Sequence, residues 1–479
     1  MRNSGKRAAK AGVAYTVGNV LLRGVSFLTL PIFSRILSTE EYGLYNLYVS
    51  YETLLTIFVG VCLYGSLRTA KYDYEESFDQ YLTSAMSLSF VSFFVVLVLG
   101  NSLYPLFFES FEFDRTILNI LIVHSYAMFV FQFYNTRLAL DFRYKQFLLV
   151  SGANSIGGTV LSIFLIVCIF KDDKHIARIY GYAFVPIVIA GIIIIWFVKN
   201  SFKKKNKIFV LEHWRYGLII SIPLVVHTFS QQILHQFDRI MISRIINNVA
   251  VGIYSFIYTI ANILQVIVQS MDNAWSVWMY EQLRYHRYEE IKKKAAAYVL
   301  LMNILYVGFI SLAPDVIRIT GTKEYHTGIP MVVPLAFSIY FVFLYSLPVH
   351  VEYYYKKTKF IAMGTLLAAT LNIALNFLLI ENAGYQAAAW NTLASYIALF
   401  IFHWQIAKKI DSTPMFPTTQ IVLSIISLTG YSVLIIALAD CILLRWTVMC
   451  VMIVCMLLLC RNIIKPMINM IPLLKKYNK

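Results

Sequence analysis

Fourteen apolar segments constrain this chain more than any other feature, because each is long enough to cross a membrane as a helix. They occur at 12–37, 43–66, 81–104, 116–136, 146–170, 179–198, 216–238, 249–274, 295–313, 326–348, 360–380, 384–407, 419–440 and 446–464. Only 14% of the residues are charged, against roughly 25% in soluble proteins. The sequence therefore predicts an all-α polytopic membrane protein with about 14 transmembrane helices.

The basic residues lie mostly in the short loops between these segments. With the N-terminus inside, the inside loops hold about three times as many Lys and Arg residues as the outside loops. We therefore expect both termini to lie on the cytoplasmic side of the membrane. The net charge of +16 comes from basic loop residues that membrane topology requires. No nucleic-acid partner is therefore predicted. Basic runs such as the lysines at 292–294 are expected to attract anionic membrane lipids.

A repeat relates the two halves of the chain. After the first and seventh segments, five identical residues recur at a constant offset of 209: Ser34, Arg35, Ile36, Gly43 and Tyr45 match Ser243, Arg244, Ile245, Gly252 and Tyr254. Six helices separate the copies, so the two six-helix lobes are parallel, as in transporters with a site between repeats. The predicted parts are an N-terminal lobe at 1–199, a basic cytoplasmic linker at 200–215, a C-terminal lobe at 216–410, and two appended helices with a basic tail at 411–479.

Two stretches carry a family resemblance. "LPIFSRILSTEEYGLYNLY" resembles the first-loop signature of polysaccharide flippases for O-antigen, capsule or exopolysaccharide, in the multidrug/oligosaccharidyl-lipid/polysaccharide exporter superfamily. "YYKKTKFIAMGTLLAATLNIALNFLLIENAGYQAAAW" is similar to a stretch of the second half in that family. The resemblance implies a flippase that moves undecaprenyl-pyrophosphate-linked oligosaccharide to the outer leaflet by alternating access. It also implies a polysaccharide polymerase and glycosyltransferases as partners.

Polar side chains recur at three- and four-residue spacings within several segments, which places each set on one helix face. Since a polar face toward lipid is costly, these faces are expected to line a cavity that binds the substrate headgroup. The predicted substrate-binding residues are Asn19, Arg23, Glu52, Arg68, His124, Arg137, His227, Gln231, His235, Asn262 and Gln269. Arg68 and Arg137 lie at the cytoplasmic ends of the second and fourth predicted helices. A guanidinium there could donate two parallel hydrogen bonds to the oxygens of a pyrophosphate. Glu52, Asp238 and Asp272 are predicted to couple transport to an ion.

Each polar set also has a structural interpretation. Arg23 and Glu52 fall at matching depths in neighbouring helices and could form an ion pair rather than bind a ligand. His227 and His235 could be hydrogen-bonded core histidines, substrate contacts or, with Asp238, metal ligands, although their spacing fits no tight zinc pattern. The Asn and Gln side chains of the eighth segment could join helices by hydrogen bonds. No metal site or cofactor is predicted.

Three other functions compete with the flippase. A drug exporter of the same superfamily would favour acidic residues in the first lobe and usually twelve helices. The sequence distinguishes a lipid II flippase only poorly from a polysaccharide flippase. A membrane-embedded polysaccharide polymerase or glycosyltransferase would need a long outside loop or an acidic metal-binding motif, and the sequence has neither. No ATP-binding GxxxxGK[ST] motif occurs. We therefore predict a transporter and not an enzyme.

Overall fold

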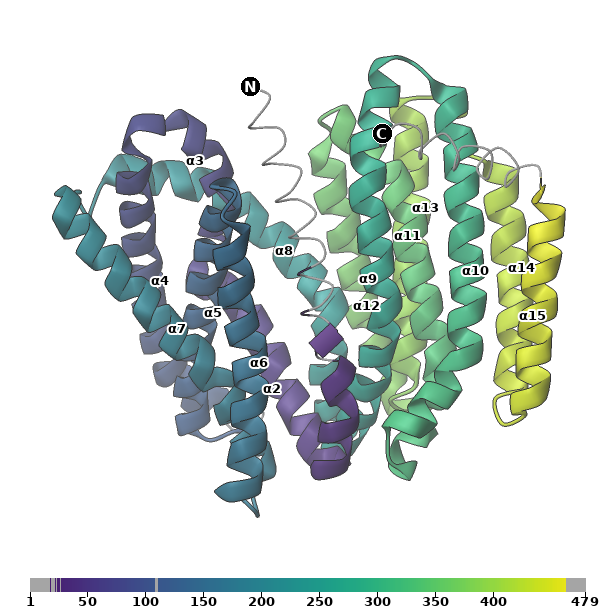
Figure 1. Cartoon of the computed structure of the whole chain (residues 1–479), viewed down its shortest axis with the longest axis horizontal. Helices are drawn as coiled ribbons and strands as arrows, with labels where there is room; N and C mark the ends of the chain where they lie inside the picture. Colours follow the sequence, from purple (N-terminus) through teal and green to yellow (C-terminus); the bar gives the residue numbers. More distant parts are fainter. Residues whose placement is uncertain (1–17, 19–21, 23, 26, 108–110, 462–479) are drawn as a thin grey trace. The chain divides into compact units, whose positions relative to one another are not determined.

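The computed structural model describes residues 18, 22, 24, 25, 27–107 and 111–461, and these contain helices and no strand (Figure 1). Asn19 and Arg23 lie outside the described residues. A short apolar helix covers Phe27–Ile36. The longer elements are α2 (Thr39–Gly60), α3 (Leu67–Asp73), α4 (Phe78–Phe107), α5 (Arg115–Leu140), α6 (Tyr144–Cys168), α7 (Lys174–Lys204), α8 (Leu211–Ile245), α9 (Asn248–Arg284), α10 (Tyr288–Thr320), α11 (Val332–Tyr354), α12 (Thr358–Ala383), α13 (Ala387–Ile410), α14 (Thr418–Ala437) and α15 (Ile442–Leu459).

Eleven of the described helices are long and apolar enough to cross a membrane, which confirms a multi-pass membrane protein. Each apolar segment predicted from 43–66 onward overlaps one long helix. The count of fourteen is approximate, because α2 and α13 have 22 and 24 residues but are not among the eleven. Both helices carry many polar side chains that are buried within the protein, which lowers the apolar content that a lipid-facing helix needs.

Packing divides the chain into two compact units, residues 1–252 and 253–479, so that α8 packs with the first unit. The predicted linker at 200–215 comprises the end of α7, a loop at 205–210 and the start of α8. This loop is held on α4, since the Ser87 hydroxyl donates to the Ile208 carbonyl at 2.8 Å. The Trp214 indole also donates to the Ser84 carbonyl at 2.9 Å. The lobe boundaries drawn from the repeat stay a prediction.

Within the first unit, α2 packs against α4, α5, α7 and α8. Its start is set by a capping box, in which Ser38 and Glu41 each accept a hydrogen bond from the other's backbone N–H. The apolar side chains of α2 join two buried clusters with α4, α5 and α7. This packing places the polar side chains in the middle of α2 inside the unit, where the site described below is found.

The glycines that recur in the repeat, Gly43 and Gly252, lie where two helices cross in the first unit. The start of α9, capped by Asn247, crosses α2, which is capped by Ser38 at the equivalent position of the repeat. A Cβ on Gly43 would lie 1.9 Å from the carbonyl oxygen of Asn248, and a Cβ on Gly252 equally close to that of Thr39. The two contacts are related by the 209-residue offset. Glycine is needed at both positions because no side chain fits between the backbones.

In the second unit, α11 packs against α10, α12 and α13 and is buried around most of its circumference. A helix apolar on all sides is expected in such a position. The neighbouring helices α12 and α13 are joined by amide hydrogen bonds. Asn391 donates to Asn376 at 3.0 Å, Asn376 donates to Asn372 at 3.3 Å, and Asn372 donates to Thr392 at 3.4 Å. These side chains therefore hold the two helices together.

The C-terminal helices α14 and α15 pack against α10 in the second unit. Their polar side chains face those of α10: Asn303 donates to the Ser424 hydroxyl at 2.7 Å, and the Tyr306 and Ser432 hydroxyls are 2.7 Å apart. At one end, Asp315 of α10 accepts a hydrogen bond from the fully buried guanidinium of Arg445. The predicted two-helix appendix is thus fastened to α10 along its length.

Candidate functional site

The first unit holds a buried carboxylate in the middle of α2. Glu52 is 4% exposed, and its Oε1 accepts a hydrogen bond from the Thr56 hydroxyl at 2.9 Å. The Thr53 hydroxyl is 3.5 Å from the second carboxylate oxygen. Both donors belong to the same helix, one of them one turn after the acid. Because Arg23 lies outside the described residues, its ion pair with Glu52 stays a prediction.

His124 of α5 lies in the same buried region as Glu52. Its Nδ1 is 3.1 Å from the Tyr48 hydroxyl, and its ring is stacked on the Tyr48 ring at 5.9 Å between centroids. Tyr182 of α7 meets the imidazole edge-on at 4.9 Å. The side chain is fully buried, and its Nε2 has no hydrogen-bond partner among the described residues. The predicted residue His124 therefore lies inside the unit, and its role in substrate binding stays a prediction.

A buried arginine just before the sixth predicted segment, which begins at residue 179, joins this region. Arg178, in the second turn of α7, lies over the rings of Phe33 and Tyr45 at 3.7 and 4.5 Å. Its guanidinium donates to the Ser162 hydroxyl at 2.7 Å and to the Tyr45 hydroxyl at 3.3 Å. Helix α7 begins at Lys174 rather than 179, so the predicted helix was too short to include this arginine. Together these residues form a polar and aromatic cluster.

The polar stripe predicted on the seventh segment lies on α8. His227, Gln231 and His235 are half-buried, whereas Asp238 is fully buried. Helix α8 contacts α2 near this stripe, since the Ser50 hydroxyl donates to Gln236 at 3.2 Å. The stripe therefore continues the polar region of α2 within the first unit. The roles predicted for these four residues in substrate binding and ion coupling stay predictions.

The two arginines predicted to bind pyrophosphate have different surroundings. Arg68 is exposed on α3. Arg137 of α5 is paired with Asp79 at 3.0 Å and with Asp141 at 3.9 Å, and lies over the Trp196 ring at 4.8 Å. The same two aspartates are also paired with Lys71 and Lys204. Three cations thus share two carboxylates, which leaves one positive charge in excess within this cluster.

In the second unit, α9 carries the residues predicted on the eighth segment. Asn262 is half-buried and Gln269 is exposed. Asp272 accepts a hydrogen bond from, or forms an ion pair with, His350 of α11, with Oδ1 and Nε2 2.8 Å apart. The other ring nitrogen of His350 is 3.0 Å from the Tyr280 hydroxyl. The structure therefore adds a histidine and a tyrosine to an aspartate that the sequence had singled out.

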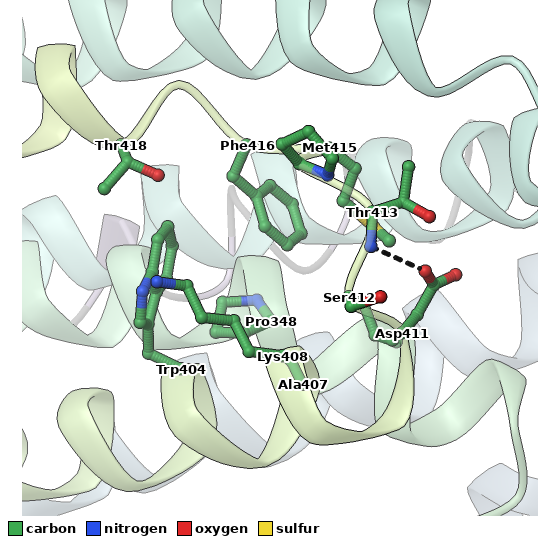
Figure 2. Close-up of a pocket in the computed structure, with 12 residues that line it drawn as sticks. Pro348, Trp404, Ala407, Lys408, Asp411, Ser412, Thr413, Met415, Phe416 and Thr418 are labelled. Carbon is green, nitrogen blue, oxygen red and sulfur yellow. Dashed lines mark hydrogen bonds between the residues drawn. The ribbon is translucent and has the colours of Figure 1, made fainter.

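A cavity of about 380 Å³ opens in the second unit where α11, α13 and the loop before α14 meet. In Figure 2, Trp404 and Lys408 extend from α13 on one side, and Met415 and Phe416 of the loop lie on the other. Asp411 accepts hydrogen bonds from the Tyr355 hydroxyl at 2.8 Å and the Thr413 amide at 3.0 Å.

Those hydrogen bonds affect the protonation of Asp411, which lies outside the spanning helices. Burial raises the pKa of this carboxyl, but hydrogen bonds from Thr413, Tyr355 and Tyr288 outweigh burial and hold the pKa below its ordinary value. Asp411 is therefore a stable anion, and with the Lys408 cation, which lies over the Trp404 ring, it makes the lining of the cavity partly polar. No residue spacing in the sequence indicates this cavity, because its lining comes from three separated stretches.

Three comparisons place this arrangement among known proteins. Residues 8–276 match the model of a family described as "polysaccharide biosynthesis protein". The "Lsg locus putative protein 1" of Haemophilus influenzae is 22% identical over 76% of this chain and 89% of that protein. A structure of the lipid II flippase MurJ in an inward closed conformation superposes with a TM-score of 0.75 at 15% identity, covering 94% of this chain and all of the other. An inward-facing multidrug resistance MATE family transporter of the MOP superfamily superposes with a TM-score of 0.61 at 12% identity. This superposition covers 82% of this chain and 99% of the other.

Proposed function

Since this chain belongs to the polysaccharide biosynthesis protein family, we propose that it is a flippase for undecaprenyl-pyrophosphate-linked oligosaccharide. It moves these units from the cytoplasmic to the outer leaflet for cell-surface polysaccharide synthesis. The proposal places the protein in a bacterial or archaeal cytoplasmic membrane with both termini inside. Transport proceeds by alternating access of two six-helix lobes, and a polymerase and glycosyltransferases act beside it.

One observation carries this proposal: a chain of this family has the fold of a membrane transporter over 94% of its length. A transporter fold in polysaccharide synthesis needs a precursor to transport, and such precursors are anionic, sugar-bearing lipids. The buried polar and aromatic cluster around Glu52, His124 and Arg178 supports the proposal, because hydroxyls and imidazoles can bind sugar hydroxyls. Arg68 and the excess positive charge around Arg137 suit the pyrophosphate.

Translocation in proteoliposomes tests the proposal. The purified protein is reconstituted with a fluorescent undecaprenyl-pyrophosphate oligosaccharide, and the fraction reaching the opposite leaflet is followed over time. We expect flipping well above that of protein-free vesicles, and a large loss in Arg23→Ala and Glu52→Ala. Glu381→Gln, at an exposed glutamate of α12, is the matched control for a charge change. Equal flipping with and without protein would disprove the proposal.

A lipid II-type flippase is the second candidate, because the fold agreement with MurJ is the highest of the structures named above. A second arm of the same assay therefore uses fluorescent lipid II, and a third uses a cationic drug. We expect the oligosaccharide substrate to be flipped fastest. Faster transport of lipid II, or of the drug alone, would reassign the substrate while leaving the transporter fold in place.

A further inference from the structure

A glutamate and a histidine that the site above does not use form a sealed pair in the second unit. Glu352 of α11 and His403 of α13 are both 0% exposed, and Oε1 and Nδ1 are 2.7 Å apart. The outer atoms of the pair, Glu352 Oε2 and His403 Nε2, have no hydrogen-bond partner among the residues that the structure describes. Buried polar atoms nearly always have partners, so two in one pair need an explanation.

The surroundings of the pair are tightly packed. Tyr345 of α11 stacks on the His403 ring at 5.8 Å, and Gly364 of α12 lies against its other edge. A Cβ on Gly364 would be 2.7 Å from His403 Nε2, so that helix leaves just enough room for the imidazole. Titratable groups on the helices around the pair are Tyr345, His350 and Tyr353 on α11, Asp272 and Tyr280 on α9, and Tyr396 on α13. Lys357, just after α11, donates its backbone N–H to the Glu352 carbonyl at 2.8 Å, but its side chain is exposed. Among the described residues, His403 is the one side chain within ion-pairing distance of the Glu352 carboxylate.

The cavity of Figure 2 opens close to this pair along both helices. Pro348 and Val351 line the cavity and lie within one turn before Glu352 on α11. Trp404 and Ala407 line it and lie within one turn after His403 on α13. The rim is polar, with Asp411 among its residues. Residues directly next to Glu352 and His403 in sequence, Val351 and Trp404, therefore line the cavity.

Burial restricts the protons that the pair can hold. A net charge is costly in a dry interior, whether the pair has lost its shared proton or gained a second one. One proton shared between Oε1 and Nδ1 keeps the pair neutral as carboxylate with imidazolium or as carboxylic acid with imidazole. Once water reaches the pair, the proton can leave as hydronium, and water then solvates the remaining carboxylate beside a neutral imidazole.

We propose that Glu352 and His403 form a proton-binding site that couples transport to a proton gradient. This inference rests on the proposed function and adds a coupling ion to it. The sealed pair keeps one proton, and a conformation that opens it toward the cavity exchanges that proton with water. The unpartnered Oε2 and Nε2 are the atoms that water would reach first.

A pH gradient across proteoliposomes tests the coupling. The measured quantity is the ratio of substrate distribution across the membrane with the gradient to that without it. For each coupled proton, one pH unit should change this distribution about tenfold in the wild type. Glu352→Gln and His403→Asn, which keep the size and polarity of each side chain, should bring the ratio close to one. Glu381→Gln should respond as the wild type does.

A second measurement tests the proton-binding site without a transport assay. A pH-difference infrared spectrum of the purified wild-type protein should contain bands of the pair that disappear in both Glu352→Gln and His403→Asn and persist in Glu381→Gln. Wild-type gradient responses in the two variants would overturn the proton site. If the wild type flips no substrate, the proposed function fails, and infrared spectra unchanged by either variant would then also overturn the site.

Discussion

The two units each bury one glutamate in a central helix, and the two glutamates are stabilised in different ways. Glu52 of α2 accepts a hydrogen bond from Thr56 of its own helix, and the Thr53 hydroxyl lies 3.5 Å away. Glu352 of α11 is bound to His403 on another helix, 51 residues away in sequence. Hydroxyl groups can solvate a carboxylate but supply no countercharge, whereas an imidazole can also accept the proton. The two buried carboxylates therefore depend on different kinds of partner, a hydroxyl of the same helix and an imidazole of another.

This difference also changes what each glutamate depends on. The described hydroxyl groups beside Glu52 belong to its own helix, so they stay in place whenever α2 is formed. The partner of Glu352 is present only while α11 and α13 are packed together, as Gly364 of α12 allows. A conformational change that separates these helices would disturb Glu352 and leave the hydrogen bonds of Glu52 intact.

The largest predicted effect comes from removing the histidine. His403→Leu leaves Glu352 buried without its partner, and the free energy of unfolding should fall by about 3–5 kcal/mol. Chemical denaturation of the purified protein measures this loss. Glu352→Leu combined with His403→Leu should recover most of it, because well-packed apolar side chains can replace a buried pair. A double variant as unstable as His403→Leu would show that packing, and not the unpaired carboxyl, causes the loss.

A smaller effect is expected at the first glutamate. Thr56→Val removes the closer of the two hydroxyl donors to Glu52 while keeping the side-chain shape. The free energy of unfolding should fall by about 1–3 kcal/mol, because a buried acceptor loses a hydrogen bond. Thr56→Ser retains the hydroxyl and should be close to wild type in the same denaturation experiment. If Thr56→Val costs more than His403→Leu, the contrast between the two glutamates is wrong.

The helices and the repeat could be predicted from the sequence because both depend on local patterns. Apolar runs of spanning length gave the helices from α2 onward, and the spacing of Gly43 and Gly252 gave the repeat whose helices cross. Helix ends were less accurate. Apolar content does not show where α7 begins, so Arg178 was assigned to a loop although it is buried beside Tyr45.

The candidate site could be predicted only in part. Glu52 and His124 could be singled out because a polar residue inside an apolar run is conspicuous, and the structure buries both, but their role in binding stays a prediction. The pair of Glu352 and His403 was missed because its members are far apart in sequence and follow no common helical spacing. The same holds for the contact of His350 with Asp272, in which only the aspartate lay in a recognised stripe. Contacts between helices depend on packing, which a single sequence does not reveal.

A third carboxylate, Asp411 at the cavity rim, sharpens the contrast because it is partly exposed to water. Hydrogen bonds hold its pKa below the ordinary value, so its contribution to stability is present above the unfolded-state pKa and is lost as pH falls through the folded-state pKa. Tyr355→Phe removes one donor, and at neutral pH we expect a loss of only about 0.5–1 kcal/mol, since water replaces part of the interaction. Denaturation at several pH values should show the difference from wild type shrinking under acidic conditions. In an Asp411→Asn background, Tyr355→Phe should show no such pH dependence, and a constant difference at all pH values would exclude this role for the carboxylate.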